Sequence, residues 1–365
     1  MTPFSDEIVT LPRRTIKKIA RDPVLTAKEV HLIYVHDHSP GISRVRDGNN
    51  DFTYLLNGIK VTDAAHLQRI KKLAIPPAWE NVWICKIANG HLQATGYDLK
   101  KRKQYKYHPQ WNGLRNQTKY YRLLEFGNVI PQMRLQIEKD LARPGMPQEK
   151  VLAAVVSLME RTTIRVGNAS YEKLYGSFGL TTLKDKHVSI SGTKLKFTFK
   201  GKKGIHHDIS IRSKRLANIV QKCRDIPGKE LFQYYDEAGN AHSIDSGMVN
   251  EYIRNVSGKD YTSKDFRTWA GTVRALLAFK DIGPAESESD SKRKIGAALD
   301  EVSVYLGNTR NVCRKYYVHP AIISLYEKNG LKNYYEELEK MEVDDGRAGL
   351  TSEEKILMKI LQTHS

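Results

Sequence analysis

Apolar and polar residues alternate with a period of two in several short runs near the start of the chain. Residues 42–60 contain one such run, with turn-forming residues at 48–51, and residues 81–97 contain another. Alternation of this kind is typical of a β-strand that buries one face. Asn89-Gly90 lies inside the second run, and this pair between alternating segments predicts a β-hairpin.

A short helical pattern at 62–73 separates these runs and ends before Pro76-Pro77, because proline prevents a helix from continuing. We therefore predict a small β-rich N-terminal domain over residues 1–117. Its first residues are rich in Lys and Arg and follow no regular period, which favours an irregular basic arm at 1–25.

The pattern changes to a helical period after residue 117. Residues 118–142 are helical and highly charged, and residues 148–160 are apolar around most of their circumference, as in a nearly buried helix. Residues 187–211 return to alternation with glycine-containing turns, which predicts a three-stranded β-meander. Helical patterns resume at 213–224, 245–255, 264–280, 291–306 and 321–340.

A last helix begins at the capping box Thr351–Glu354. The whole pattern predicts an α+β protein. It consists of the small β-rich N-terminal domain and a larger, mainly helical domain at 118–365 that contains the three-stranded β insertion.

The chain is strongly basic. Lys and Arg number 59 and Asp and Glu 41, so the formal net charge at pH 7 is +18 over 365 residues. A net charge of this size favours a polyanionic partner, and nucleic acid is the usual one. A basic protein with a merely solvated surface is the alternative.

Several classes of protein are excluded by the same sequence. No apolar run approaches ~18 residues, so we expect no membrane-spanning helix, and the first 25 residues contain no continuous apolar segment of a secretory signal. Cys85, Cys223 and Cys313 form no CxxC pair. A disulfide framework and a cysteine zinc site are therefore not expected, and a reducing compartment such as the cytoplasm fits the chain.

The densest basic cluster is Lys100–Tyr107, which contains five positive charges, two tyrosines and no acid. Basic side chains attract phosphates, and tyrosines between them can stack on or hydrogen-bond to nucleic acid. Strand alternation would place Lys101, Lys103, Tyr105 and Tyr107 on one face and Arg102, Gln104 and Lys106 on the other. A solvated charged hairpin is the alternative.

Further candidates for chemistry occur where predicted elements end. Arg165 follows the buried helix, and Lys202 lies in a glycine-flanked turn of the meander. Lys264 and Arg267 are three residues apart, so they share a helix face. Tyr317 lies in a basic stretch before a proline, and surrounding cations favour its phenolate form.

Each of these residues also has an ordinary structural explanation. An Arg near a helix C-terminus complements the helix dipole, a lysine in a surface turn is usually inert, and most of the 19 tyrosines must be structural. The order and spacing of the whole set carry more information than any single residue.

Together the motifs resemble those of the type IB DNA topoisomerases, specifically the compact poxvirus-like and bacterial branch. The motifs are IRVGN at 164–168, FKGKKG at 199–204, KDFRTW at 264–269, LGNT at 306–309 and CRKYYVHP at 313–320. The resemblance extends back through KRKQYKY in the first domain and covers roughly residues 40–345.

The resemblance implies a role for each residue. Tyr317 would attack a DNA phosphodiester and form a 3′-phosphotyrosyl bond, while Arg165 and Arg267 would contact the non-bridging oxygens of that phosphate. Lys202 would be the general acid that protonates the departing 5′ oxygen, and Lys264 would assist it.

Other roles follow from the same resemblance. Asn308 occupies a position where many members of the family carry His, and its amide can donate one hydrogen bond to a phosphate oxygen. Tyr171 would contact a further phosphate. In the first domain, Gln104, Tyr105 and Tyr107 would contact DNA, together with the basic Lys101, Arg102 and Lys103.

The resemblance also implies a monomer that clamps double-stranded DNA and relaxes supercoils of either sign without a cofactor or metal. The sequence agrees, since it contains no GxxxxGK[ST] motif for ATP and no carboxylate cluster suited to Mg²⁺. Tyr316 is adjacent to Tyr317, and adjacent helical residues point about 100° apart, so only one of them can face the phosphate. Motif register favours Tyr317.

Two alternatives remain at this point. Tyrosine recombinases and integrases share the Arg, Lys, Arg and Tyr chemistry, but their first domain is helical whereas this one is predicted to be β-rich. A non-enzymatic DNA-binding protein is the second alternative, and the intact set of catalytic positions argues against it.

Overall fold

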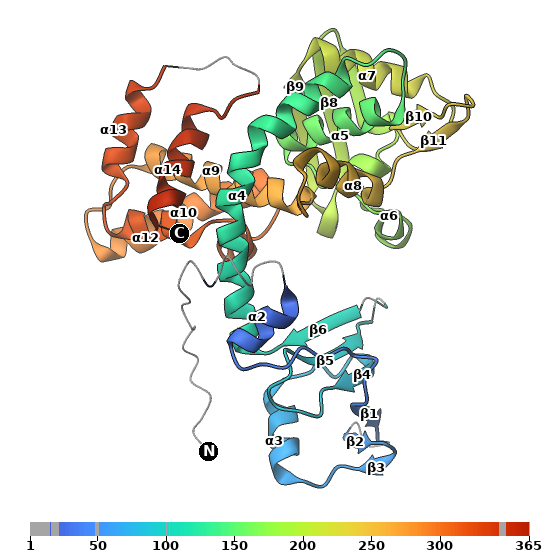
Figure 1. Cartoon of the computed structure of the whole chain (residues 1–365), viewed down its shortest axis with the longest axis vertical. Coiled ribbons are helices and arrows are strands. Elements are labelled where there is room, and N and C mark those ends of the chain that lie inside the picture. Colours follow the sequence, from blue (N-terminus) through green and yellow to red (C-terminus); the bar gives the residue numbers. More distant parts are fainter. Residues whose placement is uncertain are drawn as a thin grey trace. The chain divides into compact units, whose positions relative to one another are not determined.

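The computed structural model describes residues 15, 22–47, 51–99, 101, 103–342 and 348–364, and for 115–119 and 170 it describes the backbone alone. The chain forms two compact units, Met1–Arg122 and Leu123–Ser365. The division lies within the long helix α4, Pro109–Leu141 (Figure 1). Helices and antiparallel sheet are both present, in agreement with the α+β class expected from the sequence.

Unit 1 is built on a six-stranded antiparallel sheet with strand order β3-β2-β1-β4-β5-β6. The strands are β1 Ile42–Arg46, β2 Phe52–Leu56, β3 Ile59–Lys60, β4 Glu80–Ile84, β5 Leu92–Tyr97 and β6 Lys103–Tyr107. Helix α3, Ala64–Lys72, packs Ile70 against Ile84 and Ala94 of the sheet. Alternation of apolar residues therefore predicted the strands of this unit, and the helical pattern at 62–73 predicted α3.

Two details of unit 1 differ from the sequence-based expectation. The antiparallel pairing of β4 and β5 confirms the predicted hairpin, but its loop runs from residue 85 to 91 instead of turning at Asn89-Gly90 alone. The Gln93 side chain is buried and donates to Ala88 O and Gly90 O, at 2.9 and 2.7 Å, which holds the longer loop. Helix α2, Pro23–Glu29, is capped by Asp22, so the expected irregular arm ends by residue 22. Most of that arm, 1–14 and 16–21, lies outside the described residues.

Unit 2 is mainly helical, and helix α5, Gln148–Thr162, is its buried centre, as its apolar pattern predicted. It contacts α7, α8, α9 and the meander strand β9. The meander consists of β7 Val188–Ser191, β8 Lys194–Lys200 and β9 His206–Arg212, and it confirms the predicted three-stranded insertion. The other helices are α6 Ala169–Tyr175, α7 Lys214–Arg224, α8 Ser246–Ser257, α9 Ser263–Ile282, α10 Glu288–Leu306, α11 Arg310–Tyr316, α12 Pro320–Glu327, α13 Lys332–Lys340 and α14 Ser352–His364.

Three elements of unit 2 correct the sequence-based expectation. The helix expected at 321–340 is two helices, α12 and α13, because Asn329 adopts a left-handed conformation (φ 53°) and Gly330 N–H bonds back to Leu325 O at 2.7 Å. Unit 2 also contains a separate two-stranded sheet that the sequence analysis did not predict, β10 Gln233–Tyr235 with β11 Ala241–Ser243. Helix α4 begins at Pro109, earlier than the expected residue 118, because its first turns bury Trp111 and Leu114 in unit 1.

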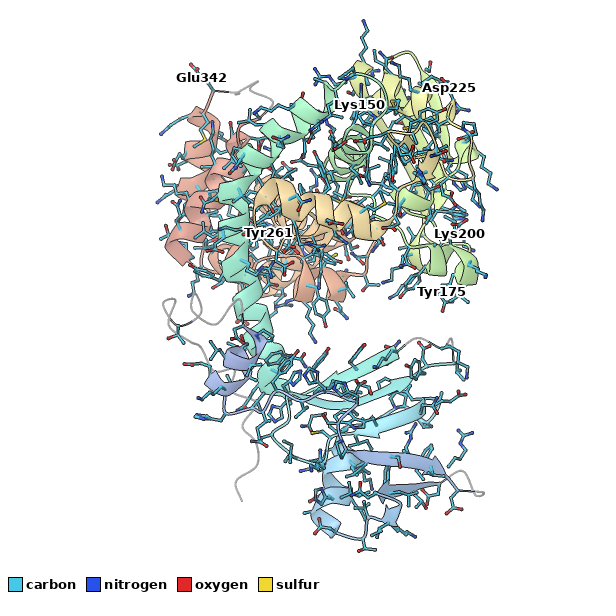
Figure 2. All side chains as sticks on the ribbon, turned by 45° about the vertical axis from the view of Figure 1, so that its right-hand side comes forward. Lys150, Tyr175, Lys200, Asp225, Tyr261 and Glu342 are labelled. Carbon is cyan, nitrogen blue, oxygen red and sulfur yellow. The ribbon has the colours of Figure 1, made fainter. Side chains whose placement is uncertain are left out.

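The C-terminal helix α14 is joined to the rest of unit 2 by a buried ion pair. Glu354 accepts two hydrogen bonds of 2.9 Å from Arg134 of α4 and one of 2.8 Å from Trp269 Nε1 of α9. It also closes the predicted capping box with Thr351. On the same helix α4, Phe126 packs edge-on to Tyr261, which lies in the interior of the unit (Figure 2). Glu354 therefore connects α4, α9 and α14 at one point.

We expect Glu354→Ala to lower the free energy of unfolding by about 3 kcal/mol. The substitution removes one of the two carboxylates that pair with the buried Arg134 guanidinium. Urea unfolding of the full chain measures this change. Lys355→Ala, at the exposed next position, is the matched control and is expected to change stability by less than about 0.5 kcal/mol. Equal effects of the two substitutions would contradict this role of Glu354.

Candidate active site

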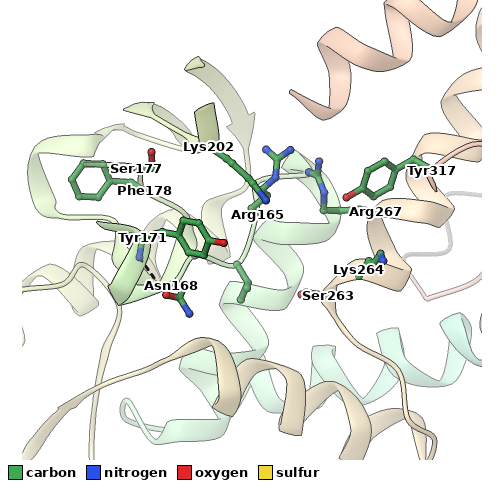
Figure 3. A pocket seen from close by; sticks show the side chains of 12 residues that line it. Arg165, Asn168, Tyr171, Ser177, Phe178, Lys202, Ser263, Lys264, Arg267 and Tyr317 are labelled. Atoms are coloured by element: carbon green, nitrogen blue, oxygen red, sulfur yellow. Dashed lines mark hydrogen bonds between the residues drawn. The ribbon is translucent and has the colours of Figure 1, made fainter. Parts of the chain in front are cut away.

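A pocket of about 270 Å³ in unit 2 brings together most of the catalytic residues expected from the sequence (Figure 3). Its walls come from the segment after α5, from α6, from the β8–β9 turn and from α9 and the end of α11. The lining residues are Arg165, Val166, Gly167, Asn168, Tyr171, Ser177, Phe178, Lys202, Ser263, Lys264, Arg267 and Tyr317. No Asp or Glu is among them, so the pocket walls carry positive charge without a carboxylate.

Arg165 reaches the pocket because α5 ends three residues earlier, at Thr162. Thr163 adopts a left-handed conformation (φ 54°) at the C-terminus of α5, which redirects the chain. The Arg165 guanidinium donates to Gly307 O at 3.0 Å and to Asn308 Oδ1 at 2.8 Å. These contacts hold Arg165 against the turn between α10 and α11.

Arg267 lies on the second turn of α9, whose N-terminus is capped by Thr262 and Asp265. Its side chain is only 5% exposed. It donates to the carbonyl oxygens of Thr163 and, at 2.6 Å, of Leu306. Carbonyl groups hold this guanidinium in place but do not neutralise its charge.

The electrostatics of the two arginines favour a bound anion. Burial, followed by the nearby positive charge of Arg267, lowers the pKa of Arg165 to about 10, so it stays charged at neutral pH. Burial also lowers the pKa of Arg267. Within the described residues, Arg267 Nε and Asn308 Nδ2 are buried donors without a hydrogen-bond partner. Buried donors are normally satisfied, and a phosphate beside these guanidiniums would supply both charge and acceptors.

Tyr317 lies at the C-terminal end of α11, and its phenol points toward Arg267 (Figure 3). The Arg267 guanidinium carbon lies 5.4 Å from the centroid of the Tyr317 ring. Tyr316 is exposed, does not line the pocket and instead contacts Lys315. The geometry therefore brings Tyr317 to the arginines and directs Tyr316 elsewhere.

The two expected lysines approach the pocket from different elements. Lys202 lies in the tight turn between β8 and β9, with its Nζ 5.7 Å from the centroid of the Tyr171 ring. Lys264 lies on the first turn of α9 and lines the same pocket.

Tyr171 is 39% exposed on α6, and its backbone N–H bonds to Asn168. Asn308 does not line the pocket itself and is connected to it by the hydrogen bond that its Oδ1 accepts from Arg165.

The expected DNA contacts of the first domain all lie in unit 1. Tyr105 and Tyr107 on β6 stack with their centroids 5.9 Å apart, and Tyr105 is 48% exposed. Lys103 pairs with Asp37 at 2.6 Å, and Lys101 pairs with Glu80, so acids distant in the sequence partly neutralise a cluster that contains none. Gln104 donates to Asp98 at 3.0 Å. Arg102 lies outside the described residues.

Two glycines that the sequence reasoning did not select shape the site. A Cβ atom at Gly271 of α9 would lie 2.9 Å from Tyr317 O, so only glycine lets α9 approach the tyrosine backbone this closely. Gly307 adopts a left-handed conformation (φ 57°), which ends α10 and turns its carbonyl to Arg165. Gly307 could have been selected from the sequence, because it belongs to the LGNT motif. Gly271 could not, because its close contact is with a residue far along the chain.

The described residues contain neither a cluster of metal-binding side chains nor a helix suited to span a membrane. No group of three or more His, Cys, Asp or Glu side chains there could hold a metal ion. Among the same residues, no helix is both long and apolar enough to cross a membrane.

Comparison with known proteins agrees with this geometry. Residues 108–343 match the family described as eukaryotic DNA topoisomerase I, catalytic core, and residues 51–98 match the bacterial DNA topoisomerase IB N-terminal domain. The chain is 30% identical over 296 residues to DNA topoisomerase 1B of Acanthamoeba polyphaga mimivirus, covering 79% of this chain and 88% of the relative. It is 25% identical over 272 residues to DNA topoisomerase 1B of Vaccinia virus (strain Copenhagen), covering 73% and 81%.

The matched residues lie in both units, and the match over 108–343 contains every residue that lines the pocket. The chain belongs to the type IB DNA topoisomerases, in the branch that contains the compact poxvirus-like and bacterial members.

Gly271→Ala is expected to reduce the rate of DNA cleavage by about 100-fold, because a shift of the tyrosine of the order of 1 Å is enough for such a loss. Single-turnover cleavage of a duplex measures the rate, and thermal unfolding checks that the fold is retained. Gly296→Ala in α10, where a Cβ meets nothing closer than 3.4 Å, is the matched control. A wild-type cleavage rate for Gly271→Ala would show that this contact does not position Tyr317.

Proposed function

We propose that this type IB topoisomerase relaxes supercoiled duplex DNA through a transient break in one strand, with Tyr317 as the nucleophile. The observation that carries the proposal is the placement of the Tyr317 phenol beside two guanidinium groups in a pocket lined by no carboxylate. Such a pocket suits a phosphodiester, which brings a negative charge and several acceptor oxygens.

In the cleavage step the Tyr317 phenol oxygen attacks the phosphorus and loses its proton to solvent. A bond forms between that oxygen and phosphorus, and the bond between phosphorus and the 5′ oxygen breaks. Lys202 donates a proton to the departing oxygen, assisted by Lys264, which leaves a 5′-hydroxyl end and a 3′-phosphotyrosyl end. Religation is the reverse of these transfers.

The arginines act on the charge that develops during the transfer. Phosphoryl transfer depends mainly on positioning and on stabilising charge at the equatorial oxygens. Arg165 and Arg267 contact those oxygens, and the free Asn308 amide N–H supplies a further hydrogen bond. The phosphotyrosyl bond keeps the free energy of the broken bond, so the cycle requires neither a nucleotide nor a metal.

Between the two steps, torsion in the duplex rotates the free 5′ end and removes supercoils of either sign.

In the proposal the two units act as a monomeric clamp on the duplex. Tyr105 and Tyr107 of unit 1, with Gln104, Lys101, Arg102 and Lys103, contact the DNA, and Tyr171 contacts a phosphate near the pocket. Phosphate contacts make binding weaker as salt increases. The match to a bacterial N-terminal domain supports action on cytoplasmic, nucleoid DNA.

Tyr317→Phe is expected to abolish the covalent adduct with a duplex whose cleaved end diffuses away, because phenylalanine has no oxygen to attack phosphorus. Denaturing gel electrophoresis detects the adduct, and relaxation of a plasmid by the purified chain tests turnover. Tyr316→Phe, the neighbouring exposed tyrosine, is the matched control and keeps the adduct. The opposite pattern would identify Tyr316 as the nucleophile.

Lys202→Ala is expected to slow cleavage by about 100-fold or more, in the range of general acid catalysis, with duplex affinity nearly unchanged. The difference arises because proton donation occurs only in the transition state. A substrate with sulfur in place of the bridging 5′ oxygen should restore the rate, since a thiolate leaves without a proton. Failure of this substrate to restore it would count against Lys202 as the acid. Lys203→Ala, the next residue of the same turn, is the control.

A further inference from the structure

His207 is a polar residue at an inward-facing position of β9. Burial alternates along this strand, and His207 shares its half-buried face with Ile209 and Ile211. It pairs across the sheet with Phe199 of β8, and the two rings stack with centroids 4.9 Å apart. The strand pattern requires an apolar residue here, and a stacked imidazole occupies the place instead.

The edge of the His207 ring lies between two glycines that flank the active site. A Cβ atom at Gly201 would lie 2.6 Å from ring atoms Cδ2 and Nε2, and one at Gly307 would lie 2.8 Å from Cε1. Gly201 has an ordinary φ of −91°, so backbone conformation does not require glycine there. The space taken by the ring explains the absence of a side chain at residue 201.

These two glycines precede catalytic residues. Gly201 leads directly into Lys202, and Gly307 leads into Asn308 and accepts the hydrogen bond from Arg165. The lysine turn is closed on itself by Gly201 N–H to Ile205 O at 2.7 Å and by Gly204 N–H to Gly201 O at 3.1 Å. A turn closed in this way moves as a unit, so a contact at Gly201 determines where the lysine lies.

A neutral His207 ring is suited to packing and not to binding an anion. Burial, followed by the positive charges of Arg165 and Arg267, lowers the pKa of His207 below its usual value of 6.5. The imidazole is therefore neutral at pH 7 and adds no further cation to the two arginines. Within the described residues neither ring nitrogen takes part in a hydrogen bond. The His207 ring therefore acts through its shape and its stacking on Phe199.

We propose that His207 is a positioning residue whose ring, seated between Gly201 and Gly307, sets the distance from the Lys202 turn to the phosphate held by Arg165 and Asn308. The proposal rests on the function proposed above, in which Lys202 protonates the departing oxygen. In this role His207 acts through the Lys202 turn and not on the DNA phosphate or the departing oxygen directly.

The test is single-turnover cleavage by the full-length chain. His207→Ala should slow cleavage of an ordinary phosphodiester by about 100-fold, since a displacement of about 1 Å is enough for such a loss. Duplex affinity should stay unchanged. The substrate with a bridging 5′ sulfur should recover most of the rate, because it requires no proton from Lys202. His206→Ala, the exposed neighbour on the opposite face of β9, is the matched control and should cleave at the wild-type rate.

Gly201→Ala gives a second and independent variant. Its added methyl displaces the ring while leaving His207 present, so it should cause the same loss and the same recovery with sulfur. Combination of Gly201→Ala with His207→Ala should be no slower than the slower single variant, since both changes remove one contact. His207→Phe should retain most of the rate, because it keeps a ring in the same space.

Four results would overturn the proposal: wild-type cleavage by His207→Ala, an equal loss on both substrates, multiplicative losses in the double variant, or a loss in His207→Phe equal to that in His207→Ala. An equal loss on both substrates would mean that the ring supports the arginines and not the lysine. A loss in His207→Phe equal to that in His207→Ala would show that a ring nitrogen is needed, and would also overturn a packing role. Wild-type chain without a Tyr317-dependent adduct would instead refute the proposed function, so the two failures are distinguishable.

Discussion

The candidate site depends on two guanidinium groups, one buried and one partly buried, that line the same pocket without a carboxylate. Removal of an unpaired charge from water costs several kcal/mol, and the fold offsets this cost with backbone dipoles. Arg165 donates to Gly307 O, and Arg267 donates to the carbonyls of Thr163 and Leu306. Carbonyl oxygens fix the direction of each side chain and leave its charge uncompensated. A phosphate would supply the missing negative charge and acceptor oxygens, which is why the proposed phosphoryl transfer suits this pocket.

Helix α9 is the element on which the site is built. It carries Lys264 and Arg267 on its first turns, and at Gly271 it approaches the backbone of the tyrosine closely enough that a methyl group would collide with it. The opposite side of the same helix is anchored through Trp269 to Glu354, and through it to α4 and α14. The buried ion pair therefore supports the helix that carries two basic side chains of the pocket, although the pair itself lies outside the pocket.

Much of the architecture was predictable from local patterns, because one buried face per element leaves a period of two or 3.6 in the sequence. The strands of unit 1, the buried helix α5, the meander and the capping box before α14 were all confirmed in this way. The predictions were wrong where a contact distant in the sequence or a single backbone angle decides the structure. The split of one expected helix at Asn329-Gly330 depends on a left-handed residue, and the early start of α4 depends on burial of Trp111 in unit 1.

The sequence by itself determined the α+β class, the order of the catalytic motifs and the family, because these depend on residue identity and spacing along one chain. The tertiary structure decided which tyrosine faces the arginines, since the end of α11 directs the two adjacent rings differently. It also decided that acids far from the basic cluster pair with Lys101 and Lys103, and that Gly201, Gly271 and Gly307 stand where another chain segment approaches. The contacts at Gly271 and Gly307 join residues separated by tens of positions, and the contact at Gly201 joins it to a ring six positions away; a periodic pattern of apolar residues indicates none of them.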